Sequence, residues 1–595
     1  MRPSSWRYSL LGLFFGVFGL AIVGQIGRMQ FTPMAEALRA QAEQYQEYQS
    51  TLEPTRGQIY DRWGHTLAGN ITVYQVGVET HRVKNANTIA SALHAILGLD
   101  PVDTLEKITQ ASAGDTPRYV VLTDYVSAEQ VEQLETYREQ TKLAGNTAPS
   151  AKGVPPPSLD GLVYQPHLMR YYPEDNLASN LLGFVSVEGR GYFGLEEKFN
   201  DLLAGNAKEV WIAQNPYKVD ADDISPVGAS LILTINREIQ DAVEDILRTS
   251  VEANGAASGT IVVMDPKTGE ILAMASTPQL NPNEYWRYAD IFRDSSTPFN
   301  RAISQAYEPG SVFKVLTMAS AIDAGAVTPK TEFIDQGAFE IGGITIRNWD
   351  GGAWGPQNMT GCMQHSLNVC LAWVASQLGV RQFYNYMDAF GIGRRTGIDL
   401  AGEATGHLKH PGDSNWYDAD LGTNSFGQGV SVTPVQMVTA VAALANQGKM
   451  VTPHVVKAIV DKGYQYDIPT QVTNQPISAE TAATVTEMLA QSLEEESSVA
   501  LVEGYRLAGK TGTAEIPTPY GYTSDVTNAS FVGWGPVDDP QFVVYIWIEK
   551  PTASIWGSVV AAPVFRQVVE RLVVLMDIPP DAVRQSLHTS LNGKP

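Results

Sequence analysis

The sequence predicts an α+β protein of more than one domain, tied to a membrane by one N-terminal helix. Three observations lead to this prediction. At 595 residues the chain is longer than a single domain usually is. From Gly228 onward, segments with helical apolar spacing alternate with short apolar runs that are typical of strands. Near the N-terminus, 20 uncharged residues follow one another without interruption.

The uncharged run covers residues 8–27 and is rich in Leu, Phe, Gly and Val. About 20 such residues are needed to cross a bilayer as a helix. Arg2 and Arg7 precede the run and only Arg28 follows it closely, so the positive-inside bias places residues 1–7 in the cytoplasm and the chain after about residue 28 outside. A cleaved signal peptide is the competing interpretation, but residues 24–28 lack an Ala-x-Ala cleavage site. We expect an uncleaved anchor.

Several further elements can be placed by pattern. Residues 36–49 predict a polar helix that leads away from the anchor, and residues 143–160, with four prolines, predict an exposed loop. We expect helices over residues 237–254, 434–447 and 563–576, a hairpin over 259–274 and a strand over 542–549. The tail from residue 578 is expected to be loose.

Three short motifs carry the chemistry of the candidate site. Each one alone occurs by chance in a long chain, and its residues could equally be a helix cap, solvated charges or polar positions on an exposed helix face. Their combination in this order argues against that interpretation and indicates an acyl-transfer site built around one serine. The motifs are Ser311-Val312-Phe313-Lys314, Ser366-Leu367-Asn368 and Lys510-Thr511-Gly512-Thr513.

Ser311 follows a turn cluster, residues 308–310, and opens an apolar run to residue 322, so a helix is expected to start at about the serine. Helix positions three apart share a face, which places Lys314 beside Ser311. A serine hydroxyl needs a neighbouring base, and an amine is a base only when it is neutral. For a lysine pKa to fall from about 10.4 to near 7, the charged form must be destabilised by about 4 kcal/mol. Burial and a second cation can supply this, and Lys510 is the candidate cation.

Residues 506–514 predict a strand, on which side chains alternate between faces. Thr511 and Thr513 would then share one face while Lys510 takes the other. Gly512 has no side chain, so a substrate backbone could lie close against this strand.

The remaining roles follow from the same chemistry. The backbone N–H groups of Ser311 and Thr513 are the candidate donors to a tetrahedral oxyanion, a contribution on the order of 100- to 1000-fold in rate per donor. Ser366 is expected to relay a proton and Asn368 to hold a substrate amide. His365 is not expected to act as a base for Ser366, because adjacent residues of a helix point about 100° apart.

The motifs resemble those of the class B penicillin-binding proteins, monofunctional transpeptidases of bacterial cell-wall synthesis, and the resemblance covers nearly the whole chain. Residues 259–274 look like the opening hairpin of the family, and residues 427–429 followed by 433–436 are similar to another of its signatures. Residues 56–64, 170–173 and 194–196 look like motifs of a non-catalytic pedestal, for which we expect the role of a structural clamp. Trp63, Asn236 and Leu367 depart from the family pattern, but none is a residue that the mechanism needs.

The resemblance implies a penicillin-binding/serine β-lactamase-like transpeptidase domain on an elongated pedestal of the dimerisation type. The chain would then divide into a cytoplasmic N-terminus (1–7), a transmembrane anchor (8–27), a juxtamembrane helix or linker (28–50), the pedestal (51–225), the transpeptidase domain (228–577) and a C-terminal tail (578–595). It would be a single-pass protein of the bacterial cytoplasmic (inner) membrane with its catalytic domain outside.

The resemblance also implies a reaction and its partners. Ser311 would attack the D-Ala-D-Ala amide of a peptidoglycan stem peptide, release D-alanine and pass the acyl group to an amine of a neighbouring stem. β-Lactam antibiotics would acylate the same serine. The implied protein partner is a polytopic membrane glycosyltransferase of the elongation or division machinery. Residues 425–429 look like division-type members and residues 67–70 like elongation-type members, so this choice stays open.

Alternatives from the same and from other classes remain. A D,D-carboxypeptidase or a serine β-lactamase would share the motifs but hydrolyse the acyl-enzyme, and the uncleaved anchor and long pedestal favour the transferase. A β-lactam sensor usually couples to a cytoplasmic domain, for which the residues before Tyr8 leave no room. A scaffold of a cell-wall synthesis complex is the last alternative, and the intact triple motif counts against it.

Composition narrows the ligand classes. A net charge of −23, from 64 acidic and 41 basic residues, argues against a nucleic-acid ligand, which selects for clustered Lys and Arg. The nine histidines are scattered, and the sequence contains no His-Glu-x-x-His or paired Cys-x-x-Cys motif. We expect no metal and no cofactor.

The two cysteines, Cys362 and Cys370, lie in a segment, residues 360–378, that predicts one helix carrying Ser366 and Asn368. Eight positions along a helix rise about 12 Å. This exceeds the Cα separation of a disulfide, about 4.4–6.8 Å. We expect two free, buried thiols.

Overall fold

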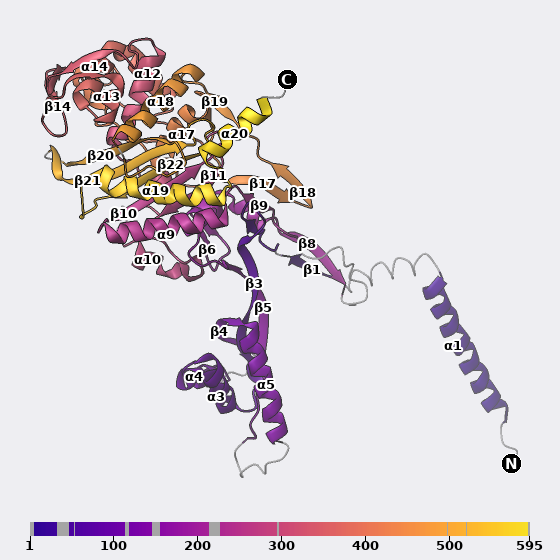
Figure 1. Cartoon of the computed structure of the whole chain (residues 1–595). Coiled ribbons are helices and arrows are strands. Elements are labelled where there is room, and N and C mark those ends of the chain that lie inside the picture. Colours follow the sequence, from indigo (N-terminus) through magenta and orange to yellow (C-terminus); the bar gives the residue numbers. More distant parts are fainter. Residues whose placement is uncertain are drawn as a thin grey trace. The chain divides into compact units, whose positions relative to one another are not determined.

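The computed structural model describes residues 5–31, 47–52, 54–112, 118–145, 155–213, 226–293, 297–496, 498–518 and 521–592. The chain forms two compact units. The first contains residues 1–55 and 204–228, and the second contains residues 56–203 and 229–595. Figure 1 shows the elements of both.

The first unit holds the membrane-anchor candidate. Helix α1 (Ser5–Phe31) includes the whole apolar run, and its segment Trp6–Arg28 is long and apolar enough to cross a bilayer. Strand β1 (Glu47–Leu52) pairs antiparallel with β8 (Lys208–Ala213). The polar helix expected over residues 36–49 is wrong at its end, because residues 47–49 belong to β1. Residues 36–46 lie outside the described part of the chain.

A five-stranded antiparallel sheet, in the order β11-β10-β22-β21-β20, is the centre of the second unit (Figure 1). The hairpin expected over residues 259–274 is present as β10 and β11, and the expected strand is β22. All residues of β10 and β11 are buried, since both faces of the sheet are covered. The strands are β10 (Ser258–Met264), β11 (Ile271–Ser276), β20 (Ala508–Thr518), β21 (Gly521–Gly535) and β22 (Phe542–Glu549).

Helices α9 (Arg237–Ala253) and α19 (Gly557–Leu575) cover one face of this sheet, as Figure 1 shows. Ile261 and Val263 pack in this layer, whereas Val262 and Met264 pack in the helical layer on the opposite face. The expected helix over residues 237–254 is confirmed, and that over 563–576 starts earlier, at Gly557.

The opposite layer consists mainly of helices and carries the first two motifs, whereas the third lies on the edge strand β20 of the sheet. The fully buried α17 (Pro434–Ala445) confirms the helix expected over 434–447, although it ends two residues earlier. The other elements of this part are η4 (Pro282–Arg287), α10 (Tyr288–Ile291), α11 (Arg301–Ser304), η5 (Gly310–Phe313), α12 (Lys314–Asp323), β12 (Glu332–Asp335), β13 (Ala338–Ile341), β14 (Ile344–Arg347), β15 (Gly355–Asn358), α13 (Met359–Gln364), α14 (Asn368–Leu378), α15 (Val380–Ala389), α16 (Asp418–Asn424), β16 (Met450–Val451), β19 (Val472–Asn474) and α18 (Ala479–Glu495).

The C-terminal tail was expected to be loose, and this is wrong for residues 581–592, which form α20 (Asp581–Asn592). Arg584 explains the difference. Its side chain is 8% exposed, and the guanidinium pairs with Asp538 and Asp581 and donates to the Pro579 carbonyl over 2.6 Å. These contacts tie the helix to the loop before β22.

A second sheet, in the order β18-β17-β9-β2-β3-β4 with β5 on β3, combines the N-terminal part of the second unit with residues 456–467. Helices α3, α4 and α5 pack against it around a separate core. Residues 146–154 of the expected loop lie outside the described ranges. The elements are β2 (Ile59–Tyr60), β3 (Thr66–Glu79), η1 (Thr80–Arg82), α3 (Ala86–Leu97), α4 (Pro101–Ser112), β4 (Tyr119–Ser127), α5 (Ala128–Gly145), β5 (Leu162–Tyr171), α6 (Ser179–Leu182), β6 (Phe184–Val185), β7 (Gly191–Tyr192), α7 (Gly194–Lys198), α8 (Asn200–Ala204), β9 (Ser230–Leu233), β17 (Val456–Asp461) and β18 (Tyr464–Asp467).

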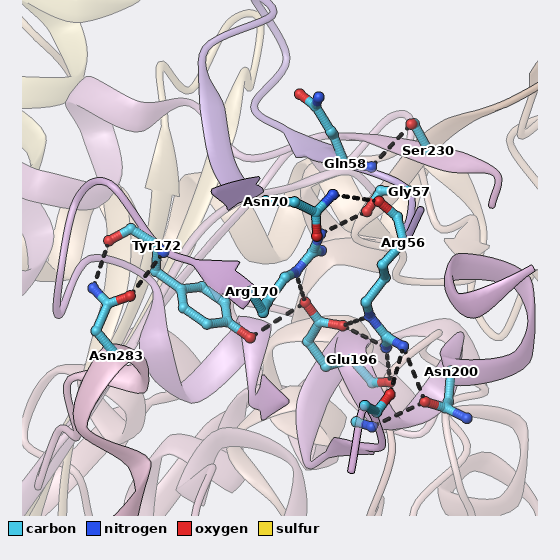
Figure 2. Close-up of polar contacts among 12 residues, drawn as sticks. Arg56, Gly57, Gln58, Asn70, Arg170, Tyr172, Glu196, Asn200, Ser230 and Asn283 are labelled. Carbon is cyan, nitrogen blue, oxygen red and sulfur yellow. Dashed lines mark hydrogen bonds and ion pairs between the residues drawn. The ribbon is translucent and has the colours of Figure 1, made fainter. Parts of the chain in front are cut away.

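The three upstream motifs meet in one buried polar cluster, which Figure 2 shows. Glu196 is fully buried and accepts hydrogen bonds from two guanidiniums, from Arg56 Nε over 2.8 Å and from Arg170 Nε over 2.7 Å. Arg170 also donates to the Gly57 carbonyl, and the Tyr172 hydroxyl lies 3.3 Å from the same carboxylate. One carboxylate thus joins segments that are up to 140 residues apart in the sequence.

Candidate active site

Ser311 lies in the 3-10 turn η5, directly before α12. The helix expected to start at about the serine therefore starts three residues later, at Lys314. Gly310 has φ +60°, and a Cβ at this position would lie 2.9 Å from the Thr513 carbonyl oxygen and from Ala514 Cβ. This close approach brings the first motif against strand β20, which carries the third motif.

Lys314 joins the first motif to the second. Its Nζ lies 2.6 Å from the Ser366 carbonyl oxygen, 2.8 Å from Asn368 Oδ1 and 3.1 Å from Ser366 Oγ. The residue is fully buried. Among the described residues, the Ser311 hydroxyl takes part in no hydrogen bond.

The second motif lies in a break between two helices, so the single helix expected over residues 360–378 is wrong. Helix α13 ends at Gln364 and α14 starts at Asn368. Between them Ser366 has φ +53°, in the left-handed region that a serine rarely adopts. The break turns the Ser366 carbonyl and the Asn368 side chain toward Lys314.

The break also corrects the prediction of free thiols. Cys362 lies on α13 and Cys370 on α14, and the two form a disulfide with a Cα separation of 6.1 Å. A continuous helix would hold these Cα atoms too far apart, but the chain reverses between them. The disulfide therefore closes a short loop that contains Ser366 and Asn368.

Strand β20 carries the third motif, as the sequence predicts. Lys510 is buried, and its Nζ lies 3.2 Å from the Thr511 carbonyl oxygen. Thr513 Oγ1 accepts a hydrogen bond from the Gly557 N–H over 3.0 Å, which ties the strand to the start of α19. A Cβ on Gly512 would lie 2.2 Å from Ser530 Oγ and 2.9 Å from Val312 Cγ1. Packing within the protein thus requires this glycine.

Burial and nearby charges shift the pKa values of both site lysines. Burial holds the pKa of Lys314 well below its usual value, and the nearby charge of Lys510 lowers it further. Burial also lowers the pKa of Lys510, to about 8, while the Glu496 carboxylate opposes this shift. Glu496 follows the last residue of α18, and no motif in the sequence pointed to it.

His365 packs among aromatic side chains. Its ring stacks on Trp354 with the ring centroids 4.4 Å apart, and its carbonyl accepts a hydrogen bond from the indole N–H of Trp349 over 3.2 Å. Burial lowers the pKa of its imidazole. A second exposed indole, Trp556, meets Trp349 edge to face, with the centroids 5.2 Å apart.

The described residues contain no group of three or more His, Cys, Asp or Glu side chains that could hold a metal ion. The polar groups gathered around Lys314 are hydroxyl, carbonyl and carboxamide oxygens. Such a set suits proton transfer and acyl transfer by a serine.

Comparison with known proteins decides the family. Residues 259–570 match the family described as the penicillin-binding protein transpeptidase domain, and residues 51–274 match the penicillin-binding protein dimerisation domain. The chain belongs to the class B penicillin-binding proteins. This family carries the α+β transpeptidase fold and a second, non-catalytic domain that the sequence predicts.

Relatives of this penicillin-binding protein extend over most of its length. It is 32% identical to stage V sporulation protein D of Bacillus subtilis, over 93% of this chain and 83% of the relative. It is 27% identical to the peptidoglycan D,D-transpeptidase FtsI of Escherichia coli, over 97% of this chain and 93% of the relative.

Solved structures show the same fold. Penicillin-binding protein 3 of Mycobacterium tuberculosis, in complex with aztreonam, has a TM-score of 0.67 and 24% identity, with 89% of this chain and 98% of that chain covered. Penicillin-binding protein 2X of Streptococcus thermophilus has a TM-score of 0.71 and 24% identity, with 89% and 80% covered.

Proposed function

We propose that this protein is a membrane-anchored peptidoglycan D,D-transpeptidase that forms an acyl-enzyme on Ser311. The family and its relatives named as peptidoglycan D,D-transpeptidases support the reaction class. The arrangement around Lys314 supports the residue roles. Stem peptides ending in D-Ala-D-Ala would be the substrates, and β-lactam antibiotics would acylate the same serine.

The observation that carries the proposal is the set of acceptors around the Lys314 amine. A neutral amine has two N–H donors and one lone pair. The Ser366 carbonyl oxygen at 2.6 Å and Asn368 Oδ1 at 2.8 Å can only accept, so they take the two N–H groups. The lone pair is then left for a hydroxyl, that of Ser311 during attack or that of Ser366, whose Oγ is 3.1 Å away.

Acylation would proceed in two proton-balanced steps. Lys314 removes the hydroxyl proton of Ser311 while the serine oxygen bonds to the carbonyl carbon of the penultimate D-alanine. The backbone N–H groups of Ser311 and Thr513 hold the oxyanion. The proton then passes from Lys314, through the Ser366 hydroxyl, to the nitrogen of the terminal D-alanine as its C–N bond breaks.

In the transfer step the protons would move in the opposite direction. The amine of a second stem peptide attacks the ester carbon, gives its proton to Lys314, and the serine oxygen recovers a proton as its C–O bond breaks. Asn368 keeps one N–H free for a substrate carbonyl, because the other donates to the Arg347 carbonyl over 3.2 Å. Thr511 and Thr513 would bind the substrate along β20.

The placement of the protein is part of the proposal. We infer that α1 anchors the chain in the cytoplasmic (inner) membrane with residues 1–7 in the cytoplasm, because Arg2 and Arg7 precede the span. The divisions inferred from the sequence would make residues 51–225 the pedestal and 228–577 the catalytic domain. The proposed protein partner is a polytopic glycosyltransferase that makes the glycan strands.

A transfer assay tests the reaction. The full-length protein is incubated with a synthetic stem peptide ending in D-Ala-D-Ala, with and without an amine acceptor, and released D-alanine and cross-linked product are measured. We expect acceptor-dependent product that is lost in Ser311→Ala. D-Alanine release with water as the only acceptor would instead indicate a carboxypeptidase, and no release with either acceptor would contradict the proposal.

A further inference from the structure

Helix α14, which carries Asn368, begins without a cap of its own. Leu367 occupies the N-cap position and has no side-chain acceptor, so the first N–H groups of the helix need an acceptor from elsewhere. Asn348 supplies one from 21 residues upstream. Its Oδ1 accepts a hydrogen bond from the Val369 N–H over 3.2 Å, and the residue is 5% exposed.

Asp335 fixes the orientation of Asn348. The Nδ2 of Asn348 donates to Asp335 Oδ2 over 2.6 Å and to the Gly352 carbonyl over 3.1 Å. Asp335 is 1% exposed, and its carboxylate also accepts the N–H groups of Gly337 and Trp354. Because a carboxylate can only accept, the amide nitrogen of Asn348 must face Asp335 and its oxygen must face α14.

The segment that carries Asn348 holds the second motif at two further points. The Arg347 carbonyl accepts a hydrogen bond from Asn368 Nδ2 over 3.2 Å, and the Trp349 indole N–H donates to the His365 carbonyl over 3.2 Å. These contacts lie on both sides of Ser366. A serine at φ +53° persists only where its surroundings hold it there.

The position of this turn matters because, among the described residues, Lys314 takes its hydrogen-bond acceptors from it, namely the Ser366 carbonyl, Ser366 Oγ and Asn368 Oδ1. These contacts orient the N–H groups of the amine and therefore the lone pair that accepts a proton. A displacement of about 1 Å in a catalytic group can cost on the order of 100-fold in rate.

We propose that Asn348 is a positioning residue for the acyl-transfer reaction, with Asp335 as its support. It acts through Val369, by fixing the start of α14 and with it the turn that presents Ser366 and Asn368 to Lys314. The inference rests on the proposed function, because acylation of Ser311 is its readout.

The test compares two asparagines that each cap the N-terminus of a helix. Asn236 is the N-cap of α9, where its Oδ1 accepts from the N–H groups of Glu238 and Ile239 over 3.0 and 3.2 Å. Full-length Asn348→Ala and Asn236→Ala are titrated with a fluorescent penicillin, which gives the first-order acylation rate and the dissociation constant separately. Melting temperatures of both are measured alongside.

We expect both variants to lower the melting temperature, because each loses a helix cap. Only Asn348→Ala should lower the first-order acylation rate, by roughly tenfold or more, with little change in the dissociation constant. Equal acylation rates in the two variants would overturn the inference. A wild type that is not acylated at Ser311 would instead overturn the proposed function itself.

Two further variants keep the inference falsifiable if Asn348→Ala folds poorly. Asn348→Asp places a second carboxylate against Asp335 and should slow acylation, while the exchange Asp335→Asn with Asn348→Asp restores an amide–carboxylate pair and should recover part of the rate. Trp349→Phe removes the indole N–H that donates to the His365 carbonyl but keeps an aromatic ring at this exposed position, and it should slow acylation by roughly threefold. No recovery in the exchange together with no effect of Trp349→Phe would contradict the inference.

Discussion

The Nζ of Lys314 donates a hydrogen bond to Asn368 Oδ1 over 2.8 Å, across 54 positions of the sequence. This contact joins the helix after the candidate nucleophile to the helix that follows the Ser366 turn. Acceptor oxygens around Lys314 stabilise the protonated form of the amine. Burial and the charge of Lys510 favour its neutral form and lower its pKa.

Removing the amine should remove the base. We expect Lys314→Met to slow acylation of Ser311 by roughly 100- to 10,000-fold, the range in which a positioned base contributes to a reaction. Acylation by a fluorescent penicillin at saturating concentration measures this. Lys267→Met, which changes an exposed lysine, is the control, and an equal effect of both substitutions would contradict the role of Lys314.

Acylation should increase as the pH is raised through the pKa of Lys314, because only the neutral amine accepts a proton. Burial and Lys510 both lower that pKa, so the rise should lie well below the usual range of lysine. Lys510→Met removes one of the two causes. The pKa of Lys314 should then increase, and the midpoint of the pH–rate profile should move to higher pH.

The midpoint is the readout in this experiment, since Lys510→Met also lowers the maximal rate if the lysine contacts the substrate. Lys510 itself has a pKa of about 8 in the wild type, so its influence on Lys314 should weaken above that pH. A midpoint that stays in place, or moves to lower pH, would show that Lys510 does not act through its charge.

The disulfide between Cys362 and Cys370 should contribute measurably to the free energy of unfolding. Its cysteines are eight positions apart. Closing a loop of this size lowers the conformational entropy of the unfolded chain and so raises its free energy by about 2.5 kcal/mol. We expect Cys362→Ser with Cys370→Ser to lower the free energy of unfolding by about that amount. Thiol titration of the denatured, unreduced wild type checks the bond itself, and two reactive thiols would contradict it.

The buried cluster around Glu196 should be sensitive to the loss of its one carboxylate. Glu196→Gln leaves the buried guanidiniums of Arg56 and Arg170 without a counter-charge, and we expect a loss of about 3–5 kcal/mol in the free energy of unfolding. Glu79→Gln removes the partner of the exposed Arg82 and should cost less than about 1 kcal/mol. Denaturant unfolding compares the two, and similar costs would contradict a buried ion network.

The apolar N-terminal helix, the central hairpin and strand β22 could be predicted from the sequence, because each depends on a local pattern. The proximity of the three motifs follows instead from their combination and order in one chain. The second motif shows the limit of such patterns. Residues 364–367 contain no Gly or Pro, so nothing local predicts a helix break at Ser366. The break depends on contacts from the distant Asn348 and Lys314, and the error in the disulfide followed from missing it.

Other errors have the same origin. Glu496 reaches Lys510 only because the end of α18 lies beside β20, and α20 is held by Asp538, which is 46 positions from Arg584. Ser530 and Val312 likewise fill the space where a Cβ on Gly512 would lie, and no pattern in the sequence indicates these contacts. Tertiary contacts of this kind leave no periodicity in the sequence.

The proposed reaction depends on Ser311 as the acylated nucleophile. Intact mass spectrometry of the detergent-solubilised protein with penicillin tests it most directly, with peptide mapping and with Ser311→Ala as the control. We expect one long-lived penicilloyl adduct, located on Ser311 and absent from the variant. An adduct of equal yield on Ser311→Ala, or no adduct on the wild type, would contradict it, and a rapidly cleared adduct would indicate a hydrolase.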